Sequence, residues 1–381
     1  GIFFKSVDHV LNGSPLHIYA ARSDPPLTDN PNDDPPIIVF LLAPFVAIAK
    51  GVGLESNLRG EVVLVTLCFI ILVPILGWLV VSAIDRLNPG LSPLQRLAAY
   101  ALVTLSPLVW LCFSPWGHIE QPLMIGLLIA TVLALQARRE LLAGVLGGLT
   151  LLTGLTAAFP LLALATLLYA SGQLRSLWRS AGLAVLILAV GVAPFLLADQ
   201  HNTAYSLLTF RPGRAIGGNS IWALVNFDRP SDLASLIRRL DTPAEALVCI
   251  AAGYAAATRL RMSVRSVDVW AILTIGALAL PMLVKVNWPY YYAAPFVLML
   301  IWELGALRDR ADSPRWPVLS VGYLIAASTL GQYIGMASIG LGDRVITGIA
   351  EFTVMLGFAA AIWYQLETRA PRDQPVPATS G

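Results

Sequence analysis

Long apolar stretches alternate with short polar segments along most of the chain. A helix that crosses a bilayer needs about 20 mainly apolar residues. Stretches of about this length predict membrane-spanning helices at 62–84, 94–113, 180–198, 267–286, 317–336 and 345–365. Shorter candidates lie at 121–137, 244–258 and 289–305, and a stretch interrupted at Phe159-Pro160 predicts a hairpin of two short helices, 141–157 and 159–171. The pattern therefore predicts about eleven spans.

The apolar stretch 37–50 is too short for a span. It holds about fourteen residues between Pro36 and Gly51, and a helix rises about 1.5 Å per residue, so it would extend about 21 Å. The hydrocarbon core of a bilayer is about 30 Å thick. We therefore predict an interfacial or re-entrant helix here.

The composition strengthens the case for a membrane protein. Of the 381 residues, 57% are hydrophobic and 13% are charged, whereas a soluble domain carries about a quarter charged residues. A soluble enzyme and a disordered chain are thereby excluded, and a net charge of +2 leaves no basic surface for nucleic acid. The predicted fold class is an all-α, polytopic transmembrane helical bundle of an integral, multi-pass membrane protein. Because the chain begins directly with a polar-flanked segment at Gly1, we expect a further span upstream of it.

Arginine placement predicts the orientation, since short cytoplasmic loops are enriched in Lys and Arg. If 37–50 does not cross, every short inner loop is basic, with Arg86, Arg96, Arg138, Arg139, Arg175, Arg179, Arg259, Arg261, Arg265, Arg308, Arg310, Arg315, Arg369 and Arg372 all on the cytoplasmic side. The predicted organisation is an outer-face juxtamembrane segment (1–61), an N-terminal transmembrane module (62–198), an outer loop (199–243), a C-terminal transmembrane module (244–369) and a disordered tail (370–381).

Two groups of ionisable residues fall on the predicted outer face. Asp33 and Asp34 could act as a general base or hold a divalent cation such as Mg²⁺ or Mn²⁺, although Asn, Asp and Pro also dominate solvated turns. His118, Glu120 and Gln121 stand where two predicted helices meet water, a costly and often functional place for charge. The alternative is that Glu120 only stabilises the N-terminus of helix 121–137.

Two further groups carry cations. Arg211, Arg214 and Asn219 surround glycines in the outer loop, where guanidinium groups and backbone N–H groups could bind a phosphate. An exposed turn near lipid headgroups is the alternative. Lys285 closely precedes Tyr290 and Tyr291 at the same predicted face, which suggests a functional role. The alternative is an aromatic belt at the membrane interface with a snorkelling lysine.

Taken in order, several segments resemble the GT-C superfamily of membrane glycosyltransferases. The stretch from Phe3 to Tyr19 looks like the juxtamembrane helix after the family's first span, and 35–44 is similar to its proline-rich start of an apolar segment. Gly117-His118-Ile119-Glu120-Gln121-Pro122 is similar to its Gly-x-x-Asp-x-Pro turn, with Glu in place of Asp. Residues 142–160 look like its helical hairpin, and 287–295 are similar to its late Tyr-x-x-Pro element.

The resemblance implies an inverting glycosyltransferase that takes a sugar, such as mannose, from a polyprenyl phosphate donor on the periplasmic, extracellular or lumenal side. It implies that Asp33 or Asp34 is the visible candidate base, with an aspartate upstream of Gly1 a better one. Phosphate binding would fall to Arg211, Arg214, Asn219 and Lys285, and substrate orientation to His118, Glu120, Gln121, Tyr290 and Tyr291. A metal ion is optional in the superfamily.

Two alternatives remain beside the enzyme. The family's hairpin often carries Thr-Lys, and this chain has Thr153-Gly154, which favours a non-catalytic subunit that binds protein partners in a larger membrane complex. A lipid transporter or flippase is the other alternative, but the chain has no evident inverted repeat. Membrane lipids are expected partners in each case.

The arginine pattern makes a topological prediction. Residues 1–61 and 199–243 should lie on the non-cytoplasmic side, with 259–266 and 306–316 opposite them. In intact cells, an impermeant thiol reagent should label Ser231→Cys but not Ser313→Cys. Equal labelling of both variants from outside would contradict the predicted orientation.

Overall fold

The structure is a computed structural model, and it describes residues 2–22, 31–54, 58–113, 118–210, 220–225, 239–309, 316–334 and 341–369. These residues form helices and the turns between them, and the β-structure among them is one isolated bridge between Arg22 and Pro31. The predicted all-α fold class is therefore confirmed for the described part of the chain.

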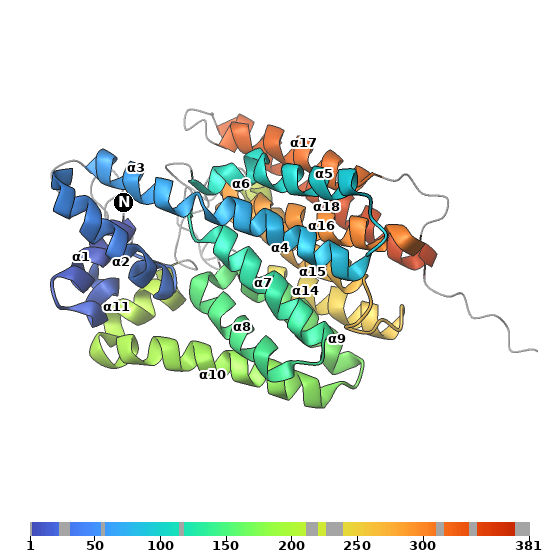
Figure 1. The fold of residues 1–381 in the computed structure, drawn as a ribbon, viewed down its shortest axis with the longest axis horizontal. Coiled ribbons are helices and arrows are strands. Elements are labelled where there is room, and N and C mark those ends of the chain that lie inside the picture. Colours follow the sequence, from blue (N-terminus) through green and yellow to red (C-terminus); the bar gives the residue numbers. More distant parts are fainter. Residues whose placement is uncertain are drawn as a thin grey trace, which may run out of the picture.

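The helices form an elongated bundle with the N-terminal helices at one end (Figure 1). The first half contains α1 (Ile2–Leu11), η1 (Pro15–Ala20), α2 (Ile37–Ala49), α3 (Leu58–Phe69), α4 (Leu72–Leu87), α5 (Pro93–Thr104), α6 (Pro107–Trp110), α7 (Gln121–Gln136), α8 (Glu140–Thr153), α9 (Ala158–Ala170), α10 (Leu174–Ala198) and α11 (Gln200–Ala204). The second half contains α14 (Asp241–Thr258), α15 (Val269–Leu283), η7 (Pro289–Tyr292), α16 (Ala293–Gly305), α17 (Val318–Ile334) and α18 (Leu341–Arg369).

Four helical segments of the described chain are long and apolar enough to cross a membrane: Arg59–Leu87, Pro93–Phe113, Leu174–Ala198 and Val345–Arg369. The other predicted spans form shorter helices, so the count of about eleven stays a prediction. The outward surface fits a lipid environment, because α10 exposes large apolar side chains such as Trp178, Val190 and Leu197. The short stretch 37–50 forms α2, whose length matches the prediction while its membrane placement remains untested.

Three helix boundaries differ from the apolar pattern. The predicted span 62–84 is divided between α3 and α4 by a turn at residues 70–71. The predicted span 94–113 is interrupted after Thr104, because Ser106 takes an extended backbone conformation before Pro107. In the predicted hairpin, the chain turns at Gly154 rather than at Pro160. Pro160 instead lies in the first turn of α9, where its missing N–H costs no helical hydrogen bond.

The bundle contains two hydrophobic cores. In the larger core, α15 is the central helix, and every residue from Val269 to Met282 is buried. The smaller core lies between α1, η1, α2 and α3, and Phe195 of α10 completes it. The N-terminal helices therefore pack mainly on one another and meet the main bundle at its end.

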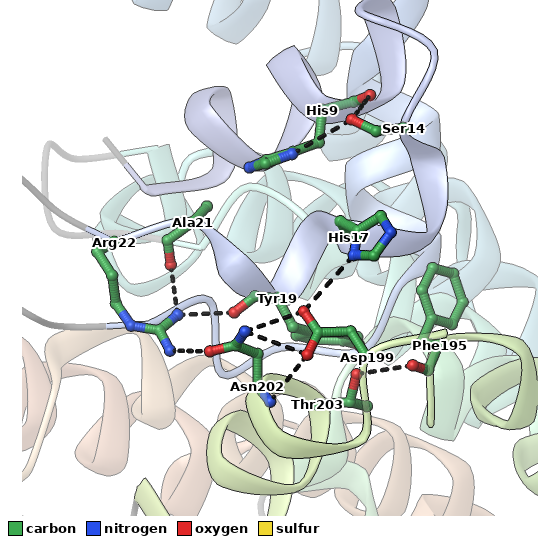
Figure 2. A network of polar contacts seen from close by, with 10 residues as sticks. All are labelled: His9, Ser14, His17, Tyr19, Ala21, Arg22, Phe195, Asp199, Asn202 and Thr203. Atoms are coloured by element: carbon green, nitrogen blue, oxygen red, sulfur yellow. Dashed lines mark hydrogen bonds and ion pairs between the residues drawn. The ribbon is translucent and has the colours of Figure 1, made fainter. Parts of the chain in front are cut away.

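A polar network joins these N-terminal residues to the end of α10 (Figure 2). Arg22 donates to the carbonyls of Tyr19 and Ala21 and to Oδ1 of Asn202. Asn202 in turn donates to Asp199, which lies 3.7 Å from Nδ1 of His17. Burial alone would raise the pKa of Asp199, but these hydrogen bonds and His17 hold it below its usual value.

Glycines permit close packing of α8 against α10 and of α14 against α9. Gly144 and Gly148 of α8 face α10, and a Cβ atom at Gly148 would lie 2.6 Å from Cβ of Ile187. At Gly253 of α14, a Cβ atom would lie 2.3 Å from the carbonyl oxygen of Ala163 in α9. Small residues at such spacings are typical of helix contacts in membranes, where association depends on close packing.

This packing predicts that Gly148→Ala destabilises the protein. The added methyl group has no room against Ile187, and overpacking typically costs about 1–3 kcal/mol. Gly182→Ala in α10 is the matched control, because a Cβ atom there meets nothing within 4 Å and alanine favours the helix. Thermal unfolding in detergent should show a lower midpoint for Gly148→Ala alone. Equal midpoints for the two variants would contradict the close contact.

Candidate functional site

Three charged side chains from two distant segments meet at the N-terminal end of the bundle. Nδ1 of His118 lies 2.7 Å from Oε1 of Glu120 and 3.1 Å from Oδ2 of Asp34. Asp34 lies just before α2, and the other two residues lie just before α7. Polar turns at the starts of two apolar helices thus bring the three groups together, and we call them the carboxylate–imidazole cluster.

The cluster is buried, so its charges must compensate one another. The exposed fraction is 0% for Glu120 and 3% for Asp34. Burying a charge is costly unless it is paired and hydrogen-bonded. Aromatic rings complete the enclosure, since Tyr290 of η7 lies 4.3 Å from His118 and Phe3 of α1 lies 5.5 Å from it, both between ring centroids.

Charge within the cluster favours its protonated forms. Burial lowers the pKa of His118, but the carboxylates of Asp34 and Glu120 outweigh burial and raise the pKa well above its ordinary value. Burial also raises the pKa of Glu120, against the opposing effect of His118.

The same three residues could hold a metal ion. Their ligand atoms all lie within 4.8 Å of one another. Among the described residues, this is the one group of three His, Cys, Asp or Glu side chains that lies close enough to share a metal ion. One imidazole nitrogen with carboxylate oxygens suits Zn²⁺ or Mn²⁺. The group contains Asp34 but not the half-buried Asp33, whereas the sequence suggested the two adjacent aspartates.

A cavity of about 440 Å³ lies between α9, α14, α15 and η7. Its polar lining consists mainly of Asp241, Glu245 and Lys285, with Nζ of Lys285 3.7 Å from Oδ1 of Asp241. Phe159, Trp288, Tyr291 and several aliphatic side chains form the rest of the wall, and we call this space the polar-ended cavity.

Aromatic residues connect the cluster and the cavity. Tyr290 contacts His118, and its ring centroid lies 4.7 Å from that of Tyr291, which lines the cavity. The Trp288 ring stacks parallel to Tyr290 at 6.5 Å. Within η7, Tyr290 therefore contacts the cluster and Tyr291 lines the cavity.

A second cavity of about 300 Å³ is almost entirely apolar. It lies among α7, α8, α9 and α10, and only Thr131 and Ser180 contribute hydroxyl groups to its lining. Ala158 and Leu162 line both cavities, so the apolar cavity adjoins the polar-ended one across the start of α9.

Most of the predicted site residues converge on this end of the bundle. Asp34, His118, Glu120 and Tyr290 come together, while Lys285 and Tyr291 line the polar-ended cavity. Gln121 is buried beside Tyr291 in a small void between α7 and η7. Arg211, Arg214 and Asn219 lie outside the described residues.

Asp241 and Glu245 are site residues that sequence reasoning missed. Both are buried and both line the polar-ended cavity. Their spacing of four residues at the start of α14 places them on one helix face, which was the available signal. Lys285 forms an ion pair with Asp241, and its role in binding phosphate stays a prediction.

A scan against protein-family models and a search of curated proteins found no match to this chain.

The protonated cluster predicts a stability that falls as the pH rises. Because the pKa of His118 is raised in the folded protein, its stabilising effect is complete below about pH 6.5 and is lost as the pH passes the raised value. The raised pKa of Glu120 acts in the same direction. Thermal unfolding midpoints between about pH 6 and 10 should decline for the wild type and less steeply for His118→Gln.

The matched control is His201→Gln, which removes an exposed imidazole from α11. It should retain the wild-type decline. If His118→Gln shows the same slope as His201→Gln, the protonated imidazole does not stabilise the fold.

Proposed function

We propose that the protein is a multi-pass membrane glycosyltransferase of the GT-C type. It transfers a hexose from a polyprenyl phosphate to an acceptor hydroxyl on the non-cytoplasmic side, with inversion at the anomeric carbon. The observation that carries the proposal is the buried cluster of Asp34, His118 and Glu120 at one end of an apolar helical bundle. Ionisable groups in such surroundings are costly and mark functional sites.

In the proposed reaction, the acceptor oxygen forms a bond to the anomeric carbon while the bond from that carbon to the phosphate oxygen breaks. Asp34 accepts the proton of the acceptor hydroxyl, and the lipid phosphate leaves with the bonding electron pair. His118 holds Asp34 and Glu120 in place through its contacts with both carboxylates. Alternatively, with His118 neutral, the same three side chains could bind a divalent cation, which would balance the charge of the departing phosphate in place of the imidazolium.

The adjoining cavities support a lipid-linked donor. The polar-ended cavity lies next to the cluster and falls within the roughly 300–1,000 Å³ of ordinary small-ligand pockets. The apolar cavity offers a hydrocarbon-compatible space beside it, as an isoprenoid chain requires. In this proposal, Arg211 and Arg214 of the outer loop remain the candidates for the phosphate, because Lys285 is already paired with Asp241.

One local feature favours the second candidate, a non-catalytic subunit with the same fold. The hairpin turn carries Gly154 where the resembling family often has lysine. A Cβ atom at Gly154 would lie 2.6 Å from Sδ of Met124, so a side chain at this turn would require the Met124 side chain to move. In this alternative the buried cluster serves only to hold the N-terminal helices against the bundle.

Activity of cluster variants distinguishes the two candidates. In proteoliposomes with a polyprenyl phosphate mannose and a panel of acceptors, Asp34→Asn and Glu120→Gln should each reduce transfer about 10²–10⁴-fold, the usual effect of losing a general base. Asp33→Asn tests the neighbouring carboxylate. Asp85→Asn is the control, because it removes a carboxylate paired with Arg96 at the protein surface, and it should retain full transfer.

Transfer that persists in both cluster variants would remove these carboxylates from the mechanism. No transfer by the folded wild type with any sugar donor would favour the non-catalytic subunit.

A further inference from the structure

Four exposed arginines gather at the end of α10 that lies away from α11 (Figure 1). Two lie in the turn between α7 and α8 and two in the first turns of α10: Arg138, Arg139, Arg175 and Arg179. Glu140 at the start of α8 connects the two pairs, because its carboxylate accepts a hydrogen bond from Oγ of Ser176 at 2.6 Å and lies 3.3 Å from Nη1 of Arg179. We call these four residues the arginine group.

Positive charge exceeds negative charge at the arginine group. Glu140 pairs with Arg179. Within the described ranges, no carboxylate forms an ion pair with the other three members, Arg138, Arg139 and Arg175. Four guanidinium groups thus face one carboxylate. This balance favours an anionic ligand, and guanidinium groups bind phosphate oxygens in bidentate pairs.

Arg138 occupies a backbone position that usually belongs to glycine. Its φ of 59° lies in the left-handed region, where α7 ends with the N–H of Arg139 donating to the carbonyl of Ala134. Glycine is the usual residue at this point of a helix end, since a side chain there is strained. The chain therefore carries an arginine where its backbone alone would favour glycine, which indicates a role for the guanidinium group.

Two helices begin beside the arginine group. Neither α8 nor α10 has a side-chain N-cap hydrogen bond, and α10 has no acidic residue in its first turn. The first backbone N–H groups of a helix lack partners within the helix, and the helix dipole makes this end positive. Both effects favour an anion here, in addition to the arginine side chains.

The length of α10 places the arginine group at a membrane surface. At about 1.5 Å per residue, about 30 Å of helix separates Arg175 from Phe195, which matches the hydrocarbon core of a bilayer. Because Phe195 packs with the N-terminal helices, the arginine group lies at the opposite surface from them. The arginine distribution along the chain predicts that this surface is cytoplasmic, where anionic phospholipids make the leaflet negative.

The outward face of α10 continues from charged to aromatic and then to apolar side chains. Trp178 is 74% exposed, and the exposed Val185 follows it by two turns on the same side of the helix. Leu186, also exposed, follows Arg179 by the same interval. Tryptophan favours the headgroup level of a membrane, and aliphatic side chains favour its acyl chains. A phospholipid can use all three kinds of contact, whereas a free phosphate ion can use only the first.

We propose that the arginine group binds the phosphate of an anionic phospholipid in the cytoplasmic leaflet, with Trp178 beside its glycerol region and its acyl chains along the outward face of α10. The bound lipid bridges the α7–α8 turn and the start of α10. This site is separate from the carboxylate–imidazole cluster, and it does not depend on the proposed glycosyltransferase function.

The test compares two phospholipids that carry the same acyl chains. The full chain, freed of lipid in detergent, is titrated with phosphatidylglycerol and with phosphatidylcholine, and dissociation constants are measured by native mass spectrometry. The wild type should bind phosphatidylglycerol at least about fivefold more tightly than phosphatidylcholine. Arg138→Gly and Arg175→Gln should each weaken phosphatidylglycerol binding about fivefold, the effect of one basic residue near anionic lipid, and change phosphatidylcholine binding less than about twofold.

Arg138→Gly separates the loss of charge from a loss of folding. Glycine suits the left-handed backbone at this position, so the thermal unfolding midpoint should equal or exceed that of the wild type. Arg96→Gln is the matched control, since it removes one arginine from α5, which packs on α4, and it should leave both affinities unchanged.

Three results would overturn the lipid site. They are equal affinity of the wild type for the two phospholipids, unchanged binding in both Arg138→Gly and Arg175→Gln, and equal weakening in these variants and in Arg96→Gln. None of them bears on glycosyl transfer, because the assay contains no sugar donor.

Discussion

Ion pairing of His118 with Asp34 and Glu120 is the constraint on which the arrangement of this end of the molecule depends. Burying either carboxylate or the charged imidazole alone would carry a large desolvation cost. Together the three side chains form an ion-paired group. Since Asp34 precedes α2 and the other two residues precede α7, that pairing fixes the N-terminal helices against the bundle. Tyr290 then packs against His118, and the polar-ended cavity lies on the other side of Tyr290 and Tyr291.

The same pairing has two consequences for chemistry. It keeps two carboxylates and an imidazole together in a water-poor place, and it raises the pKa of His118 well above its ordinary value. Replacing His118 leaves two carboxylates without their cationic partner, whereas replacing one carboxylate leaves the other paired with His118. Effects of substitutions in the cluster are therefore expected to be non-additive, as they are for groups that act as a unit.

Most of the long helices could be predicted from sequence to within a few residues. An apolar run of helical length occurs where a helix is buried in lipid or in protein, so its ends mark the ends of the helix. The break at Ser106-Pro107 was missed, since the apolar residues on both sides hide a local backbone preference. Each member of the cluster was a candidate, yet sequence gave no means to pair Asp34 with His118 across the intervening helices. Asp241 and Glu245 were missed because acidic residues at a helix start have an ordinary explanation in the helix dipole.

The division into two hydrophobic cores has a consequence for how the molecule opens. α1, η1, α2 and α3 bury their apolar side chains mainly against one another. They meet the main bundle through the ion-paired cluster, the hydrogen bonds around Arg22 and Asn202, and a few apolar side chains: Leu72, Phe113, Ile119, Phe195 and Leu207. The N-terminal helices can thus behave as one cooperative unit in hydrogen exchange, detaching together while α15 and its neighbours stay protected.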